Sequence, residues 1–179
     1  MKATGRWSIL FFALLLLGFS SCKKINQLLT FTVNDTSEVT IDANPLPITL
    51  PFEIWTPPIT TNSDEEFQNN NTKSSLVKDV YITHLYLKIK SPSDKTFSFL
   101  KSMAIYISTN DDDEIELAHK DNISSDAKEI QLTVTSARLD TYIKADSYKL
   151  RTEVTTRETL TEKVTIGIDM SFKVTADPL

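Results

Sequence analysis

Apolar and polar residues alternate along most of the chain after residue 77, and the alternation is clearest near the C-terminus. There, apolar side chains occupy every second position, and polar residues or glycine fill the positions between them. The apolar set is Val164, Ile166, Ile168, Met170, Phe172 and Val174. A period of two places alternate side chains on opposite faces of a β-strand. The pattern predicts a strand with one buried and one solvated face, at the centre of its sheet.

Shorter stretches with the same period predict further strands. They are Val80 and Ile82 followed by Leu85, Leu87 and Ile89; Ile105 and Ile107; Ile115 and Leu117; Ile130, Leu132 and Val134; and Tyr148, Leu150, Thr152 and Val154. Two more short strands are expected over Leu29 to Val33 and Val39 to Ile41. About seven to nine half-buried strands predict an all-β fold, an immunoglobulin-like or related antiparallel β-sandwich. A β-barrel is the alternative that periodicity leaves open.

One or two short helices interrupt this pattern. Ser63 and Glu66 have the spacing of a capping box, which predicts a short helix through Phe67. Leu139, Tyr142 and Ile143 have helical spacing and predict a second one, which would cover an open end of the sandwich. Both helices are expected to be minor parts of the fold.

An irregular connection rich in proline and asparagine is expected over residues 45–75, which contain five prolines and a run of three asparagines. Proline cannot donate a hydrogen bond to a β-ladder and is confined to edges and strand starts. Leu46 to Ile54 is therefore an edge strand at best.

The beginning of the chain has a different character. Lys2 and Arg6 precede an apolar run, residues 7–18, and small residues then lead into Cys22, the only cysteine. This order resembles a bacterial lipoprotein signal, in which cleavage before the cysteine frees it for diacylation. The run is shorter than the roughly 20 residues of a membrane-spanning helix. An ordinary secretory signal is the remaining alternative.

These features divide the chain into a signal peptide (1–21), an acylated N-terminus with a short tether (22–27) and one β-sandwich domain (28–179). Cleavage would leave 158 of the 179 residues, enough for a single domain with a sizeable core. The domain would need no membrane-binding surface of its own, because acyl chains on Cys22 would hold it to the bilayer.

Charge excludes one class of partner. The signal segment holds Lys2 and Arg6 and no acidic residue, so the rest of the chain has 17 of the 19 Lys and Arg residues against 24 Asp and Glu, a net charge of −7. Binding to nucleic acid depends on a concentrated basic face, so no nucleic-acid partner is expected. Acylation of Cys22 would also leave no thiol for a disulfide or a zinc site.

Four aromatic residues are candidate ligand-binding positions. Trp55 lies between prolines and could present its ring at a sheet edge; the alternative is that it covers the bottom of the sandwich. Tyr81 and Tyr86 are expected near the polar face of one strand, and Tyr106 near that of its hairpin partner. Cross-strand aromatic pairing, which stabilises a sheet without any ligand, is the alternative role for the tyrosines.

No catalytic residue, metal site or cofactor is predicted. Residues 110–114 are rich in oxygen ligands, but they lack the glycine of a calcium loop and are interpreted as a solvated hairpin turn. His84 and His119, the only histidines, are expected at the surface. Neither lies near a nucleophile turn of the G-x-S-x-G type. The chain is therefore not expected to be an enzyme.

The sequence resembles small lipoproteins of unassigned function found in Bacteroidetes. The resemblance lies in residues 16–22, Leu-Leu-Gly-Phe-Ser-Ser-Cys, in residues 90–102 leading into Ile-Tyr-Ile-Ser, and in the ending Phe-Lys-Val-Thr-Ala-Asp-Pro-Leu. It implies a non-enzymatic cell-envelope lipoprotein with a binding or structural role, and an envelope protein is a candidate partner. A lipoprotein that binds a small molecule or a glycan is the alternative.

The resemblance also implies a location in the outer membrane. The resemblance implies that lipoproteins exported to the surface of these bacteria carry a run of acidic residues just after the cysteine. In this chain, Lys23 and Lys24 occupy that place. The expected orientation is therefore towards the periplasm, with the cell surface as the alternative.

Replacement of Cys22 tests the expected anchor. Cys22→Ala removes the acylation site, so the protein should move from the membrane to the soluble fraction when cells are fractionated. The unsubstituted chain should stay with membranes, and mass spectrometry should find its N-terminal cysteine acylated. A Cys22→Ala protein that remains with the membrane would show that acylation is not what holds it.

Overall fold

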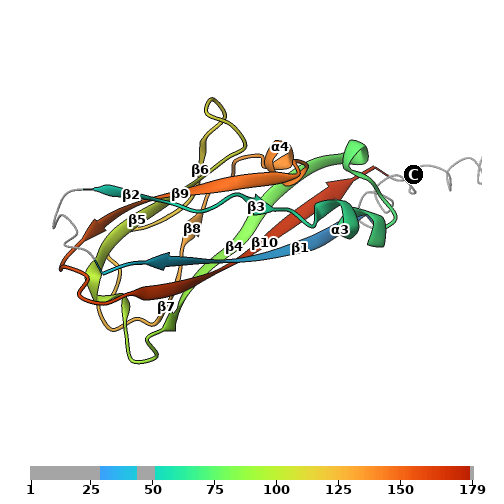
Figure 1. Ribbon diagram of the computed structural model, residues 1–179. Helices are drawn as coiled ribbons and strands as arrows, with labels where there is room; N and C mark the ends of the chain where they lie inside the picture. The colour runs from blue at the N-terminus through green and yellow to red at the C-terminus, as the bar shows by residue number, and fades with distance from the viewer. Residues whose placement is uncertain (1–28, 44–50, 178–179) are drawn as a thin grey trace, which may run out of the picture.

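The computed structural model describes residues 29–43 and 51–177, which form two antiparallel β-sheets packed face to face (Figure 1). The expected signal peptide, the tether with Cys22, and the first part of the connection after residue 44 lie outside the described residues. Among the described residues, no helix has the length and apolar character needed to cross a membrane. The predicted β-sandwich is confirmed, and the strands divide into two separate sheets instead of closing into a barrel.

The first sheet contains four strands in the order β1-β10-β4-β7. Their bounds are β1 Thr30–Ile41, β10 Val164–Ala176, β4 Val77–Ser91 and β7 Glu129–Gln131. The C-terminal strand with the clearest alternation, β10, pairs with β1 on one side and with β4 on the other. Its predicted central position is confirmed.

The second sheet has the order β2-β9-β5-β6-β8, and β3 also pairs with β9. The bounds are β2 Phe52–Trp55, β3 Ile59–Thr60, β5 Leu100–Ser108, β6 Ile115–Lys120, β8 Thr133–Val134 and β9 Ser147–Thr156. The short β2 is an edge strand, as the prolines around it predict. Residues 51–75, expected to be irregular, also contain β3, the helix α3 (Ser63–Asn69) and the 3₁₀ turn Ser74–Leu76.

Strand β4 is one continuous strand although its apolar residues break the period of two. Val80 follows Val77 by three positions, and Leu85 follows Ile82 by three. The pairing with β10 shifts at both places, as in β-bulges, where an extra residue restores the buried face. At the second shift, the hydroxyl of Thr83 donates a hydrogen bond to the carbonyl of Ser171 across the strands (3.0 Å).

Residues 30–41 also form one strand, whereas two short strands were expected. The apolar pattern breaks because Asp35 and Ser37 occupy inward positions of β1. The phenol of Tyr148, on the opposite sheet, donates a hydrogen bond of 2.7 Å to the Asp35 carboxylate. Burial, together with this carboxylate, raises the pKa of Tyr148 well above its usual range, so the phenol remains a donor. This bond links the two sheets beside the edge strand β1.

The segment expected to form one strand over Ile130 to Val134 divides between the two sheets. Strand β7 pairs with β4, and β8 pairs with β6 in the other sheet. Leu132, between them, is buried, and its amide donates to the carbonyl of Leu85 (3.0 Å). The chain therefore crosses from one sheet to the other along this side of the sandwich.

The two predicted helices are present, but one prediction about α3 is wrong. Ser63 is a buried residue inside α3, its N-cap is Asn62, and no side chain caps the helix, so the expected capping box does not form. Phe67 is fully buried and meets Phe31 of β1 edge to face, with ring centroids 6.2 Å apart. The helix α4 (Asp140–Ile143) has Tyr142 and Ile143 buried beside the sheets.

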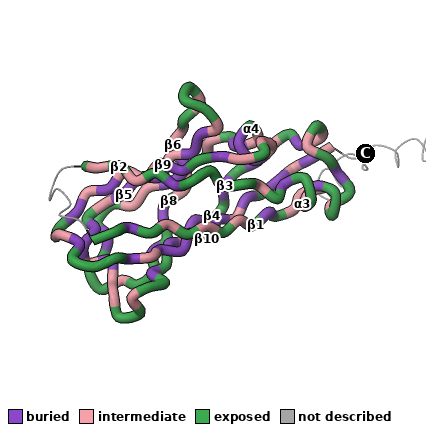
Figure 2. The backbone as a smooth tube through the Cα atoms, viewed as in Figure 1, coloured by how far each residue is buried: buried purple, intermediate pink, exposed green. Residues whose placement is uncertain are grey.

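The inward faces of both sheets form one apolar core, which Figure 2 shows as alternating buried and exposed positions along the strands. The 3₁₀ turn Phe97–Phe99, which follows β4, contributes further buried side chains to this core: Phe97, Phe99 and the adjacent Leu100. A void of about 20 Å³ remains between the sheets, too small for a ligand. The interior is therefore filled by the protein's own side chains.

A charge on the inner face of β10 tests this packing. Ile168 is 2% exposed and faces the second sheet, so Ile168→Asp places a carboxylate in the apolar core. We expect a loss of about 4 kcal/mol or more in the free energy of unfolding, or failure to fold.

Chemical denaturation followed by circular dichroism would measure the change. Asp169→Asn, at the neighbouring exposed position, is the matched control and should change stability by about 0.5 kcal/mol or less. Equal stability of the two variants would contradict the assigned inner face.

Candidate functional site

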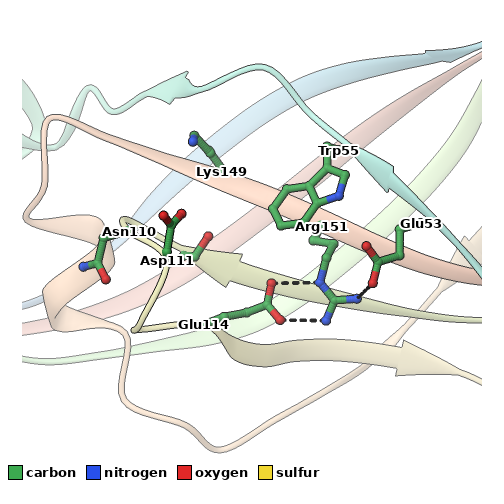
Figure 3. A pocket seen from close by; sticks show the side chains of 8 residues that line it. Glu53, Trp55, Asn110, Asp111, Glu114, Lys149 and Arg151 are labelled. Atoms are coloured by element: carbon green, nitrogen blue, oxygen red, sulfur yellow. Dashed lines mark hydrogen bonds and ion pairs between the residues drawn. The ribbon is translucent and has the colours of Figure 1, made fainter.

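A polar pocket lies on the outer face of the second sheet, centred on Arg151 of β9 (Figure 3). Arg151 is paired in register with Trp55 of β2 on one side and with Tyr106 of β5 on the other. Because alternate residues of a strand face opposite sides, all three side chains project outwards. The guanidinium lies 4.1 Å from the Tyr106 ring centroid and 5.9 Å from that of Trp55. The sheet register alone therefore creates a row of two aromatic rings with a cation between them.

Carboxylates surround the guanidinium of Arg151. Glu114 accepts two hydrogen bonds from it, at 2.8 Å from Nε and 2.6 Å from one terminal nitrogen. The other terminal nitrogen lies 2.9 Å from Glu53 and 3.5 Å from Glu153. Glu53 and Glu153 are paired across β2 and β9, so the arginine offsets the repulsion between two like charges. The cation holds three acidic side chains in place.

The ion pair changes the titration of both partners. Hydrogen bonds from Arg151 lower the pKa of Glu114 below its usual value. The same hydrogen bonds raise the pKa of Arg151, which therefore stays charged at any pH of interest. Its side chain is only 12% exposed, whereas that of Glu53 is 51% exposed. Arg151 is thus a fixed internal support, and three of its N–H donors are already bonded to the carboxylates of Glu53 and Glu114.

The pocket has a volume of about 360 Å³. Its lining residues are Glu53, Trp55, Ser108, Asn110, Asp111, Glu114, Lys149 and Arg151. Trp55 is 52% exposed, the largest exposure among the big hydrophobic side chains that the structure describes as exposed. The lining has three acidic and two basic groups. This balance disfavours anions and suits a neutral, hydroxyl-rich ligand that can lie against an indole ring.

The turn over residues 110–114 forms one side of the pocket. It joins β5 to β6 as the expected hairpin turn. The carboxylate of Asp113 accepts hydrogen bonds from the amides of Thr109 (2.8 Å) and Asn110 (3.1 Å) and from the Thr109 hydroxyl. Burial raises the pKa of Asp113, but these hydrogen bonds outweigh it, so the pKa is lowered. The backbone carbonyl of Asp113 also accepts from Tyr142 of α4, which holds the turn in place.

The structure brings together two of the four predicted aromatic positions. Trp55 and Tyr106 lie on either side of Arg151, and Trp55 presents its ring at a sheet edge instead of covering the bottom of the sandwich. Tyr81 and Tyr86 belong to β4 in the other sheet. The expectation that Tyr106 lies on the hairpin partner of their strand is wrong, because β5 pairs with β6 and β9. The chain crosses between the sheets after β4.

The remaining candidates lie at the surface. His84 is exposed and stacks with Tyr86, with ring centroids 6.1 Å apart. His119 is partly exposed, and its Nδ1 lies 2.8 Å from a carboxylate oxygen of Glu116. In residues 29–43 and 51–177, no group of three His, Cys, Asp or Glu side chains is arranged to hold a metal ion.

The sequence pattern does not predict the charged part of the pocket. Arg151 occupies a polar position of the strand predicted from Tyr148 to Val154, so its outward direction was predictable. Its partners Glu53 and Glu114 are 98 and 37 residues away in the chain. Only the strand order, with β9 between β2 and β5, brings them together.

Comparisons with known proteins give no family. No family model matches the chain, and no curated protein matches it. Solved structures with some likeness include a chain of Desmodium yellow mottle tymovirus, at 13% identity and a TM-score of 0.31, which covers 84% of this chain and 90% of the other. A chain of turnip yellow mosaic virus has 15% identity and a TM-score of 0.34, covering 84% and 95%. These scores are too low to support a conclusion about function.

Removal of the Glu114 carboxylate tests the ion pairs around Arg151. Glu114→Gln keeps the shape of the side chain but loses the ion pair, so we expect a loss of about 1 to 2 kcal/mol in the free energy of unfolding at pH 7. The folded-state pKa of Glu114 is lowered, so its contribution is present above the unfolded-state pKa and is lost as the pH falls through the folded-state pKa.

Urea denaturation of both proteins from pH 7 down to pH 3 would follow the difference, which should shrink towards acid pH. Glu116→Gln, on the same sheet face beside His119, is the control for removing a carboxylate. A difference between wild type and Glu114→Gln that is constant over this range would contradict the assigned ion pair.

Proposed function

We propose that the chain is a lipid-anchored cell-envelope protein with a non-enzymatic binding role, attached through acyl chains on Cys22. The order of basic residues, apolar run and small residues before the single cysteine supports the anchor. In this proposal the protein lies in the outer membrane and faces the periplasm. The resemblance to Bacteroidetes lipoproteins supports that location.

One observation carries the binding role: a preformed polar pocket on the outer face of a sandwich whose interior is filled. The void between the sheets is about 20 Å³, whereas the Arg151 pocket is about 360 Å³, in the range of small-ligand sites. Three charged groups of the pocket, Arg151, Glu53 and Glu114, already pair with one another, and strand register places both flanking rings beside them. Such an arrangement favours recognition of a ligand over chemical conversion.

A glycan is the ligand class that this pocket favours. Sugar rings present C–H groups that stack on an aromatic face, and Trp55 offers such a face in an exposed position. Sugar hydroxyls both donate and accept hydrogen bonds, and the lining supplies carboxylates, an amide and an ammonium group at Asp111, Asn110 and Lys149. The slight excess of acidic groups favours neutral sugars over acidic ones.

Removal of the Trp55 indole ring tests the proposed glycan binding. Trp55→Ala removes the stacking surface, so the affinity for a bound oligosaccharide should fall about tenfold or more. The detergent-solubilised full chain would be screened on an array of neutral, acidic and amino oligosaccharides, and positive sugars would be measured by calorimetry.

Tyr81→Ala is the matched control, because Tyr81 is also an exposed aromatic residue but belongs to the other sheet. It should leave the affinity unchanged. Absence of binding to every sugar, together with co-purification of a stoichiometric envelope protein, would favour a protein ligand. Turnover of ester, peptide or glycoside substrates by the purified protein would contradict the non-enzymatic role.

A further inference from the structure

Strand β1 is a long edge of the first sheet. It runs for twelve residues and pairs along its whole length with β10. Within residues 29–43 and 51–177, β10 is its only strand partner. The backbone groups of every second residue of β1 therefore point away from the sheet. Edges of this kind accept a further strand unless the sequence prevents it.

The sequence of β1 is symmetric about Thr36 in the pattern of its side chains. A second copy of the strand, placed antiparallel with the two Thr36 residues opposite each other, pairs residue i with residue 72 − i of its partner. The pairs on the inner face are then Phe31 with Ile41, Val33 with Val39, and Asp35 with Ser37. The pairs on the outer face are Thr32 with Thr40, Asn34 with Glu38, and Thr36 with itself. In every pair, both side chains lie on the same face of the sheet, and apolar residues are opposite apolar residues and polar residues opposite polar ones.

Charge is compatible with this register. The two acidic residues of β1, Asp35 and Glu38, each lie opposite a neutral hydrogen-bonding side chain, Ser37 and Asn34. No two like charges are opposite each other, which would destabilise the pairing. The hydroxyl of Ser37 can donate to the partner's Asp35 carboxylate, which has accepting capacity beyond its bond from Tyr148.

Apolar side chains also remain partly uncovered at this edge. Phe31 and Val39 face the core but are only partly buried, whereas Val33 is 2% exposed. In the paired arrangement, Phe31 would lie beside the partner's Ile41, and Val39 beside the partner's Val33. The inner faces of the two sandwiches would then be continuous across the strand pair.

From the open edge, the symmetric pattern and the matched charges, we infer that β1 is a homodimer interface: two copies of this chain pair antiparallel through β1, about a twofold axis at Thr36. The dimer has a continuous eight-stranded sheet formed from the two four-stranded sheets. The interface is isologous, with the same residues contributed by both copies. The Arg151 pocket lies on the other sheet, so this inference is independent of the proposed ligand.

Cysteine cross-linking tests the register. The two Thr36 positions lie opposite each other, with Cβ atoms roughly 4.5 to 5.5 Å apart, close to disulfide geometry. Thr36→Cys in the full chain should therefore give a disulfide-linked dimer on a non-reducing gel. The unsubstituted chain, which carries the same Cys22, is the control for the native cysteine.

Single variants at Thr32 and Thr40 complete the register test. Two Thr32 positions would be separated by eight residues, about 27 Å, so Thr32→Cys alone should not cross-link, and the same holds for Thr40→Cys. A mixture of Thr32→Cys and Thr40→Cys proteins should cross-link, because these positions are paired. All three threonines are exposed, so the substitutions spare the core.

A charge on the twofold axis tests the dimer in solution. Thr36→Lys places two ammonium groups opposite each other, so dimerisation of the detergent-solubilised full chain should weaken about tenfold or more. Thr32→Lys faces the partner's Thr40 and is the matched control, expected to dimerise nearly as well. Analytical ultracentrifugation would measure both, with circular dichroism to verify folding.

Two results together support the inference: Thr36→Cys forms a disulfide-linked dimer, and Thr36→Lys weakens dimerisation. A monomer at micromolar concentration, or cross-linking of Thr32→Cys and Thr36→Cys alike, would overturn it. Capture of a different envelope protein by Thr36→Cys, in place of a second copy, would also overturn it and would assign the edge to a hetero-partner.

Discussion

The apolar face of β10 determines which side chains of the neighbouring strands face the core. Its inward side chains, from Val164 to Val174, lie between the equivalent faces of β1 and β4 and against the second sheet. Because side chains alternate along a strand, a shift of one residue would move every apolar group to the solvent side. The bulges in β4 are therefore compensations that keep its apolar residues on the face set by β10.

Because apolar side chains fill the space between the sheets, a ligand or partner can bind only to the outer surfaces and edges of the sandwich. The polar positions of the second sheet collect into the Arg151 pocket, since strand register places Trp55 and Tyr106 on either side of the cation. The edge of the first sheet is left with a symmetric run of side chains in β1. The proposed ligand and the inferred dimer thus use different sheets, and one can exist without the other.

The sequence predicts well what depends on local period and less well what depends on strand order. The buried face of β10 and the turn over residues 110–114 follow from neighbouring residues, and both are confirmed. The division of residues 130–134 between two sheets does not, because both pieces keep the same alternation. The pairing of Arg151 with Glu53 spans 98 residues and depends on β2 lying beside β9. Local pattern carries no information about such distant neighbours.

Residue-resolved hydrogen exchange tests the central position of β10 most directly. Backbone amides open with free energies that approach the global value in the best-packed strands. We expect amides of β10, paired on both sides, to exchange most slowly, and amides of β2, a short edge strand, to exchange much faster. Exchange of β10 as fast as that of β2 would show that β10 is not the best-protected strand of the core.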